Sequence, residues 1–334
     1  MERLKRKRTV LSGVGLLFVV AAFAGVADAA LVQRESFVGS YGLSTDGFGD
    51  TSNSGSISAF VPFGATVERA YLYSTTNGTS SNSTLGDVTL GGTSVTFFEQ
   101  WTNDIPPDYL NFFRTGISDV TSIVKPTIDA GFGGTYNFSV TESLDATDGE
   151  ALVVIYSLAG LPTATVSILD GKQALAGDRF VATFASPLTA GFFAEMMLGD
   201  SFSTGGQSSS VTVNGTIITE NAGNGDDGGD TNGALITVGG NDDPFSTLLP
   251  TYENDHERYN LVPYIALGDT SITVDTINPS NDDNIFLAAF YLSGIAGINE
   301  PPPTNAPVPE PGTLLLLGSG LVGLVGYRRT KRMM

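Results

Sequence analysis

The chain has 334 residues, a formal net charge of −19 and no cysteine. The absence of cysteine excludes disulfides, Cys-ligated zinc, iron–sulfur clusters and thiol nucleophiles. Residues 30–308 hold 7 Lys/Arg against 32 Asp/Glu, a net charge of −25, and so acidic a surface is not expected to bind nucleic acid or anionic lipid.

The N-terminal segment has the three parts of a secretory signal peptide. A basic stretch from Arg3 to Arg8 precedes an apolar run from Val10 to Val26. A cleavage site of the A-x-A type follows, in which Ala27 and Ala29 are the small residues and Ala30 is the first residue after the cut. We therefore expect residues 1–29 to be removed on export and to take no part in the fold.

The body between the two ends of the chain has the pattern of a β-sandwich protein. Short β-branched and aromatic runs, such as Ser56–Val61 and Ala151–Tyr156, recur about every 8–12 residues with turn signals between them. No segment of the body has a sustained 3.6-residue periodicity. The pattern predicts an all-β fold.

Two hairpin patterns in the body resemble one another at an offset of 123 residues. Val88–Thr96 and Val211–Thr219 both read as a strand, a Gly-containing turn and a second strand. Flanking segments match near the same offset, among them Ala70–Leu72 with Ala194–Met196. We expect two tandem, duplicated β-sandwich domains, residues 30–160 and 161–298; independent use of a common hairpin pattern is the alternative.

The order of elements in the first half suggests a subclass of sandwich. The strand at Ala70–Tyr73, the hairpin at Val88–Thr96 and the strand at Thr135–Val140 follow one another. This order resembles galactose-binding-like jelly rolls and the adhesin-like sandwiches of bacterial exported proteins. The resemblance implies a carbohydrate-binding or adhesive role, although a shared fold does not by itself fix function.

Two loops hold the candidate binding residues. In the first, Trp101 and Tyr109 are candidates for stacking on a sugar ring, with packing over the sandwich edge as the alternative. In the second, Asp226, Asp227 and Asp230 are candidate calcium ligands, because calcium prefers several oxygen donors. Their spacing does not fit an EF-hand, so a solvated acidic loop is the alternative.

Catalytic patterns are weak in this chain. The single histidine, His256, lies in a polar loop, and there is no G-x-S-x-G elbow for a serine hydrolase. A lone histidine also argues against a mononuclear zinc enzyme, which usually recruits several. A pair of carboxylates suffices for a glycosidase, so glycan hydrolysis stays open as an alternative.

The C-terminal 27 residues form a membrane-sorting tail. A Pro-rich linker over 299–307 leads to Val308, Pro309, Glu310 and Pro311, and then to an apolar run for which we expect a transmembrane helix at 312–327. The apolar run Gly312–Gly326 would span about 22 Å as a helix, against a hydrocarbon core of about 30 Å, so the anchor is marginal. The run ends in a cluster that the positive-inside rule keeps cytoplasmic, namely Arg328, Arg329, Lys331 and Arg332.

In order and spacing this tail, residues 308–334, resembles the PEP-CTERM sorting signal of Gram-negative exported proteins. The resemblance implies exosortase as the processing protease, a transient anchor in the inner membrane, and a setting of exopolysaccharide or biofilm production. An ordinary C-terminal anchor is the alternative.

The combined expectation is an exported, non-enzymatic structural or adhesive protein of the cell surface or extracellular matrix. A carbohydrate-binding protein and a glycan hydrolase are the alternatives. No cofactor is expected apart from calcium at the acidic loop.

Overall fold

The computed structural model describes residues 30–78, 84–102, 112–143, 147–174, 177–201, 208–222, 227, 235–240, 249–250, 257–279 and 284–303. The predicted signal peptide and the predicted sorting signal with its helix at 312–327 lie outside these ranges. Within them, no helix is long and apolar enough to cross a membrane.

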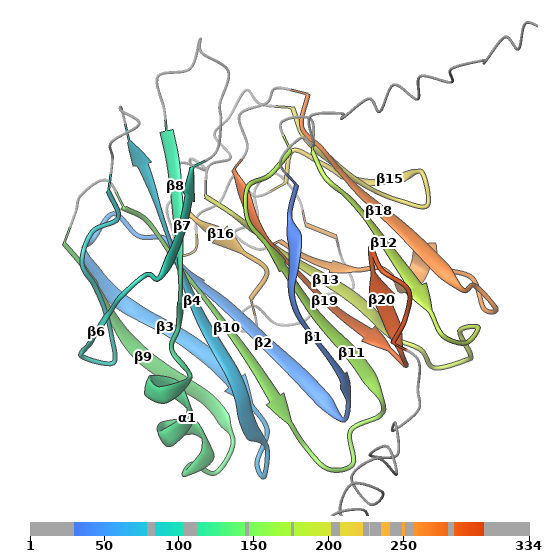
Figure 1. The fold of residues 1–334 in the computed structure, drawn as a ribbon, viewed down its shortest axis with the longest axis horizontal. Coiled ribbons are helices and arrows are strands. Elements are labelled where there is room, and N and C mark those ends of the chain that lie inside the picture. Colours follow the sequence, from blue (N-terminus) through green and yellow to red (C-terminus); the bar gives the residue numbers. More distant parts are fainter. Residues whose placement is uncertain are drawn as a thin grey trace, which may run out of the picture.

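The described residues form four antiparallel sheets (Figure 1). The first outer sheet has the order β3 (Ser54–Val61), β9 (Gly134–Glu142), β5 (Val88–Leu90), β6 (Thr93–Val95). The first inner sheet has the order β2 (Tyr41–Phe48), β10 (Thr147–Ser157), β4 (Thr66–Gly78), β8 (Phe112–Asp119), β7 (Glu99–Thr102). The prediction of an all-β body is confirmed.

The second half of the chain supplies most of the other two sheets. The second inner sheet has the order β1 (Val32–Gly39), β11 (Ala164–Asp170), β19 (Ile285–Ser293), β13 (Ala194–Asp200), β16 (Thr237–Val238), with β17 (Arg258–Asn260) also paired to β13. The second outer sheet has the order β15 (Thr216–Glu220), β14 (Ser210–Val213), β18 (Ser271–Ile277), β12 (Arg179–Phe184), β20 (Ala296–Ile298).

The two pairs of sheets share one strand order. The inner order β2-β10-β4-β8 corresponds to β11-β19-β13-β17, and the outer order β3-β9-β5-β6 corresponds to β12-β18-β14-β15. The hairpins that match in sequence, β5–β6 and β14–β15, occupy the same place in this order. The strands β1 and β20 are additions at the edges of the second pair, and β1 comes from the N-terminal end of the chain.

Three apolar cores show that the sheets stack as four layers. One core lies between the first outer and inner sheets, and a second lies between the second inner and outer sheets. A third joins the two inner sheets, with Val153 and Ile155 of β10 on one side and Ile168 of β11 and Ala289 of β19 on the other. The central inner strands β10 and β19 are therefore buried on both faces, which accounts for the long apolar runs in their sequences.

A short helix departs from the expectation of a purely β body. The helix α1 (Thr121–Asp129) follows β8 and packs against β4 through Val124 and Ile128. These two residues are four positions apart, so they face the same way, but nine residues are too few for a sustained periodicity. A 3-10 turn, η1 (Val262–Tyr264), stands at the corresponding place after β17.

Candidate functional site

The two ends of the stacked sandwiches differ in chemistry. At the end that we call the turn end, β3 leads into β4, β10 into β11, and β12 into β13. At the opposite end, the carboxylate end, β4 and β13 finish while β10 and β19 begin. Both sandwiches point the same way, since a short connection joins the last residue of β10 to the start of β11.

At the carboxylate end of the first sandwich, two glutamates share a buried site. Glu150 on β10 is fully buried, and Ser74 on β4 donates a hydrogen bond of 2.9 Å to its Oε1. Burial, with the nearby Glu142 carboxyl as the next cause, raises the pKa of Glu150 well above its usual range. Burial also raises the pKa of Glu142. The two carboxyl groups therefore lie close enough to influence each other's protonation.

The second sandwich also buries carboxyl groups at this end. The hydroxyl of Tyr259 donates to Glu257, which lies just before β17, and burial raises the pKa of Glu257 to about 8, with Asp200 as a smaller contribution. These three residues line a cavity of about 30 Å³. That volume holds one or two water molecules and is too small for a sugar ring.

The turn end instead presents a groove and exposed aromatic rings. The groove has a volume of about 500 Å³, within the usual range for ligand sites. Its lining comes from the β12–β13 connection, the end of β19 and the link between the two halves, including Pro162, Phe184, Leu188, Phe192, Phe193 and Ile295. The ring of Phe193 packs against Tyr291, with centroids 4.6 Å apart.

Three phenylalanines of the first sandwich stand at the same end, and we call them the aromatic rim. Phe60, Phe63 and Phe132 are 44%, 70% and 88% exposed. Phe60 is the last residue but one of β3, Phe63 lies in the turn to β4, and Phe132 lies in the connection from α1 to β9. The backbones of Phe63 and Gly133 are so close that a Cβ on Gly133 would lie within 3 Å of Phe63.

These rings and the buried glutamates are barely marked in the amino-acid sequence. The Pro62-Phe63-Gly64 turn carries one signal, because an apolar residue at the tip of a tight turn is usually exposed. No comparable signal marks Glu150 or Glu257, because burial of a carboxyl depends on the neighbouring strands.

The predicted site residues that the structure describes have structural contacts. Trp101 on β7 is half-buried against the core between the two inner sheets. Asp227 is buried, and its carboxylate accepts a hydrogen bond of 2.6 Å from the Val238 N–H. Among the described residues, no group of three or more His, Asp or Glu side chains is placed to hold a metal ion. Sugar contact through Trp101 and calcium binding at Asp227 stay predictions.

The other predicted site residues lie outside the described ranges, apart from Ala30. They are Ala27, Ala29, Tyr109, Asp226, Asp230, Val308, Pro309, Glu310, Pro311, Arg328, Arg329, Lys331 and Arg332. The single histidine, His256, also lies outside these ranges. Ala30 is exposed and directly precedes the buried Leu31.

Comparison with known proteins adds one match, at the C-terminal end. The family described as the PEP-CTERM protein-sorting motif matches residues 307–330. No curated protein and no solved structure matches the chain. The predicted sorting signal is thereby confirmed, and it indicates an exported, surface-targeted protein that exosortase processes.

Proposed function

We propose that the mature protein is a non-enzymatic adhesive protein of the cell surface or extracellular matrix, which binds polysaccharide through the turn end of its two sandwiches. The observation that carries the proposal is that the aromatic rim and a groove of about 500 Å³ lie at the same end of the two sandwiches. The sorting motif supplies the compartment.

Exposure of the rim has a physical cost that binding would offset. An apolar side chain gains about 1.5–3 kcal/mol when it is buried, so leaving Phe63 and Phe132 in water sacrifices stability. Contiguous exposed apolar surface usually marks an interaction site. The flat faces of sugar rings are apolar, and aromatic rings stack on them.

The location of the buried acids favours binding over hydrolysis. A glycosidase needs two carboxyl groups that flank a bound glycosidic bond. Glu150 and Glu257 are enclosed and belong to different sandwiches, and the cavity beside Glu257 holds only one or two waters. The groove at the turn end, by contrast, is lined mainly by apolar side chains and backbone.

The shared strand order supports a further part of the proposal, internal duplication. Two copies of one sandwich present two turn ends side by side, one with the rim and one with the groove. Two adjacent weak contacts on one polymer strengthen each other, because the second becomes intramolecular. We infer that duplication gives the protein avidity for a repetitive polysaccharide.

Co-sedimentation of the secreted mature protein with cellulose, chitin and the producing cell's own exopolysaccharide tests the proposal. A double variant, Phe63→Ser with Phe132→Ser, is expected to weaken binding at least about tenfold, which corresponds to about 1.4 kcal/mol. The matched control is Phe98→Ser, since Phe98 is 60% exposed but follows β6 at the side of the first inner sheet.

A reducing-sugar assay on the same samples separates the alternatives. Binding without new reducing ends supports the adhesive function. Release of reducing ends would instead establish a glycan hydrolase. Equal binding by the double variant and the wild type would remove the aromatic rim as the contact surface.

A further inference from the structure

A buried aspartate next to the predicted start of the mature chain has an unused oxygen. Asp178, directly before β12, is 5% exposed, and its Oδ1 accepts a hydrogen bond of 3.3 Å from the Leu31 N–H. Its Oδ2 is buried and makes no close hydrogen bond among the described residues; beyond the Leu31 N–H, only the backbone N–H of Ala174 acts on this carboxylate. An unpartnered carboxylate oxygen in the protein interior is costly, so this oxygen calls for a partner.

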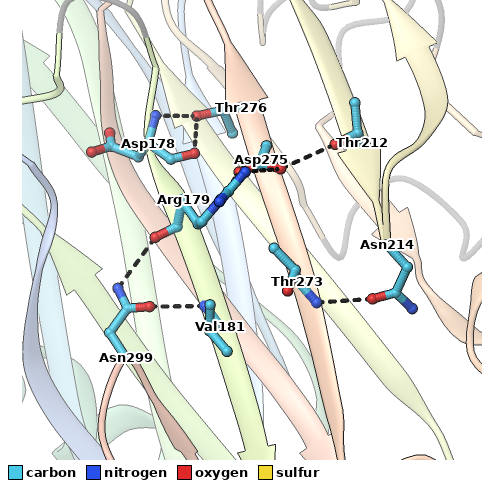
Figure 2. A network of polar contacts seen from close by, with 9 residues as sticks. All are labelled: Asp178, Arg179, Val181, Thr212, Asn214, Thr273, Asp275, Thr276 and Asn299. Carbon is cyan, nitrogen blue, oxygen red and sulfur yellow. Dashed lines mark hydrogen bonds and ion pairs between the residues drawn. The ribbon is translucent and has the colours of Figure 1, made fainter.

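The backbone of Asp178 is fixed on both sides. Its N–H donates to Thr276 Oγ1 at 2.9 Å, and its carbonyl accepts from the Thr276 N–H at 2.9 Å. Figure 2 shows the Asp178 carboxylate pointing away from Thr276 and from the rest of the network. The carboxylate is therefore held in place toward the N-terminal segment and not toward the outer face of the sheet.

The two nearby arginines form ion pairs with other aspartates and not with Asp178. Arg179 forms an ion pair of 2.5 Å with Asp275 on the exposed face, and Arg34 pairs with Asp170 (Figure 2 shows the first pair). Lys172 is the other cation of the segment between β11 and β12. Burial raises the pKa of Asp178 to about 6, while the backbone N–H groups of Leu31 and Ala174 oppose the shift.

The N-terminal segment places one further backbone nitrogen next to the Leu31 N–H that already binds this carboxylate. Leu31 is 3% exposed and belongs to the core of the second sandwich, which anchors the chain at this point. The nitrogen of Ala30 is one residue away, within about 4 Å of the Leu31 nitrogen. Ala30 itself is exposed, and cleavage before it would make its nitrogen the end of the chain.

We propose that export processing creates the missing partner: the α-ammonium group of Ala30 binds Oδ2 of Asp178 once the Ala29–Ala30 bond is cut. Signal peptidase adds one water across that bond. Ala29 leaves with a carboxylate, and the amine released on Ala30 takes up a proton. This inference rests on the export that is part of the proposed function, but not on polysaccharide binding.

The new contact would stabilise the packing of β1 against the second sandwich. The same carboxylate would then accept from the Leu31 N–H and from the ammonium group of the preceding residue. Hydrogen bonds between charged groups are roughly twice as strong as neutral ones. The uncleaved precursor has a neutral amide at Ala30, which can donate a hydrogen bond but cannot form an ion pair, so we expect the mature protein to be the more stable form.

Competitive acetylation of the secreted protein with trace acetic anhydride measures the pKa of its α-amine. In the wild type we expect this pKa to lie about one unit above the ordinary value of about 7.7–8.0, with about tenfold slower labelling at neutral pH. Asp178→Asn should restore ordinary labelling. Insertion of one glycine between Ala29 and Ala30 should do the same, because it moves the amine away from an intact Asp178.

Lys172→Met is the control, and it should leave the labelling slow. N-terminal sequencing accompanies every sample. Two results would overturn the proposal. One is a wild-type mature chain that starts elsewhere than Ala30. The other is a wild-type α-amine that is acetylated as fast as the α-amine of the glycine-insertion variant. If Asp178→Asn fails to fold, the acetylation rates of the wild type and of the glycine-insertion variant are compared without it. Loss of polysaccharide binding with slow labelling retained would count against the proposed function only.

Discussion

Several carboxyl groups of this acidic chain are buried with no ion pair to a described Lys or Arg. Glu150 lies near Glu142, Glu257 accepts from Tyr259, and Asp178 accepts from the Leu31 N–H. Burial disfavours the charged form, so each of these side chains has a raised pKa. The net charge of the folded protein near neutral pH is consequently less negative than the composition suggests.

Replacing Glu257 with glutamine should change how stability depends on pH. The ordinary glutamate pKa is about 4.3 and that of buried Glu257 is about 8, so between these values the folded protein binds a proton that the unfolded chain has lost. The stability from Glu257 is therefore complete below about pH 4 and declines as the pH rises to about 8, by at most about 1.4 kcal/mol per pH unit.

Urea unfolding of the wild type and of Glu257→Gln at pH 5, 7 and 9 checks this. The variant should resemble the wild type at pH 5 and be the more stable protein at pH 9, because a neutral amide keeps an acceptor for the Tyr259 hydroxyl. Glu220→Gln, at an exposed position on β15, is the control. Parallel pH curves for the wild type and Glu257→Gln would contradict the raised pKa.

At the scale of the elements, the sequence predicts the long strands better than their partners. The apolar runs of β10 and β19 and the turns of the β5–β6 and β14–β15 hairpins are visible as local patterns. The pairing of β1 with β11 joins residues more than 120 positions apart, and local pattern carries no such information. The aromatic rim is similarly assembled from two separate connections.

The strand β1 should be essential to the second sandwich. It pairs with β11 along its length, and Leu31 just before it fills the core. Deleting residues 30–39 would expose the edge of β11 and remove Leu31, so we expect a lower thermal midpoint and self-association through the free edge. Calorimetry with light scattering measures both. Val32→Ser, at a 64% exposed position on β1, should change little.

The whole molecule is held together by the contact between the two inner sheets. The sequence predicts two tandem sandwiches, and a strand that is apolar on both faces, such as β10, is the signal that each has a second buried side. That signal does not say what covers the second face, because many partners would satisfy it. In the structure, the second face of each inner sheet is buried by the other half of the chain. Val153 and Ile155 pack toward Ile168 and Ala289.

This arrangement predicts that the halves do not exist separately. Residues 30–161 and 162–303, produced as two chains, would each expose an apolar inner sheet, and β1 would lack β11. We expect each to aggregate alone and the two to form a soluble 1:1 complex when co-expressed, as gel filtration would show.

The intact mature protein should unfold in a single calorimetric transition, since shared cores couple the layers. Val153→Ala, in the core between the inner sheets, and Val154→Ala, in the core of the first sandwich, should both lower that one transition. Two soluble, non-interacting halves would mean that the sandwiches are independent domains, each able to turn its binding end separately.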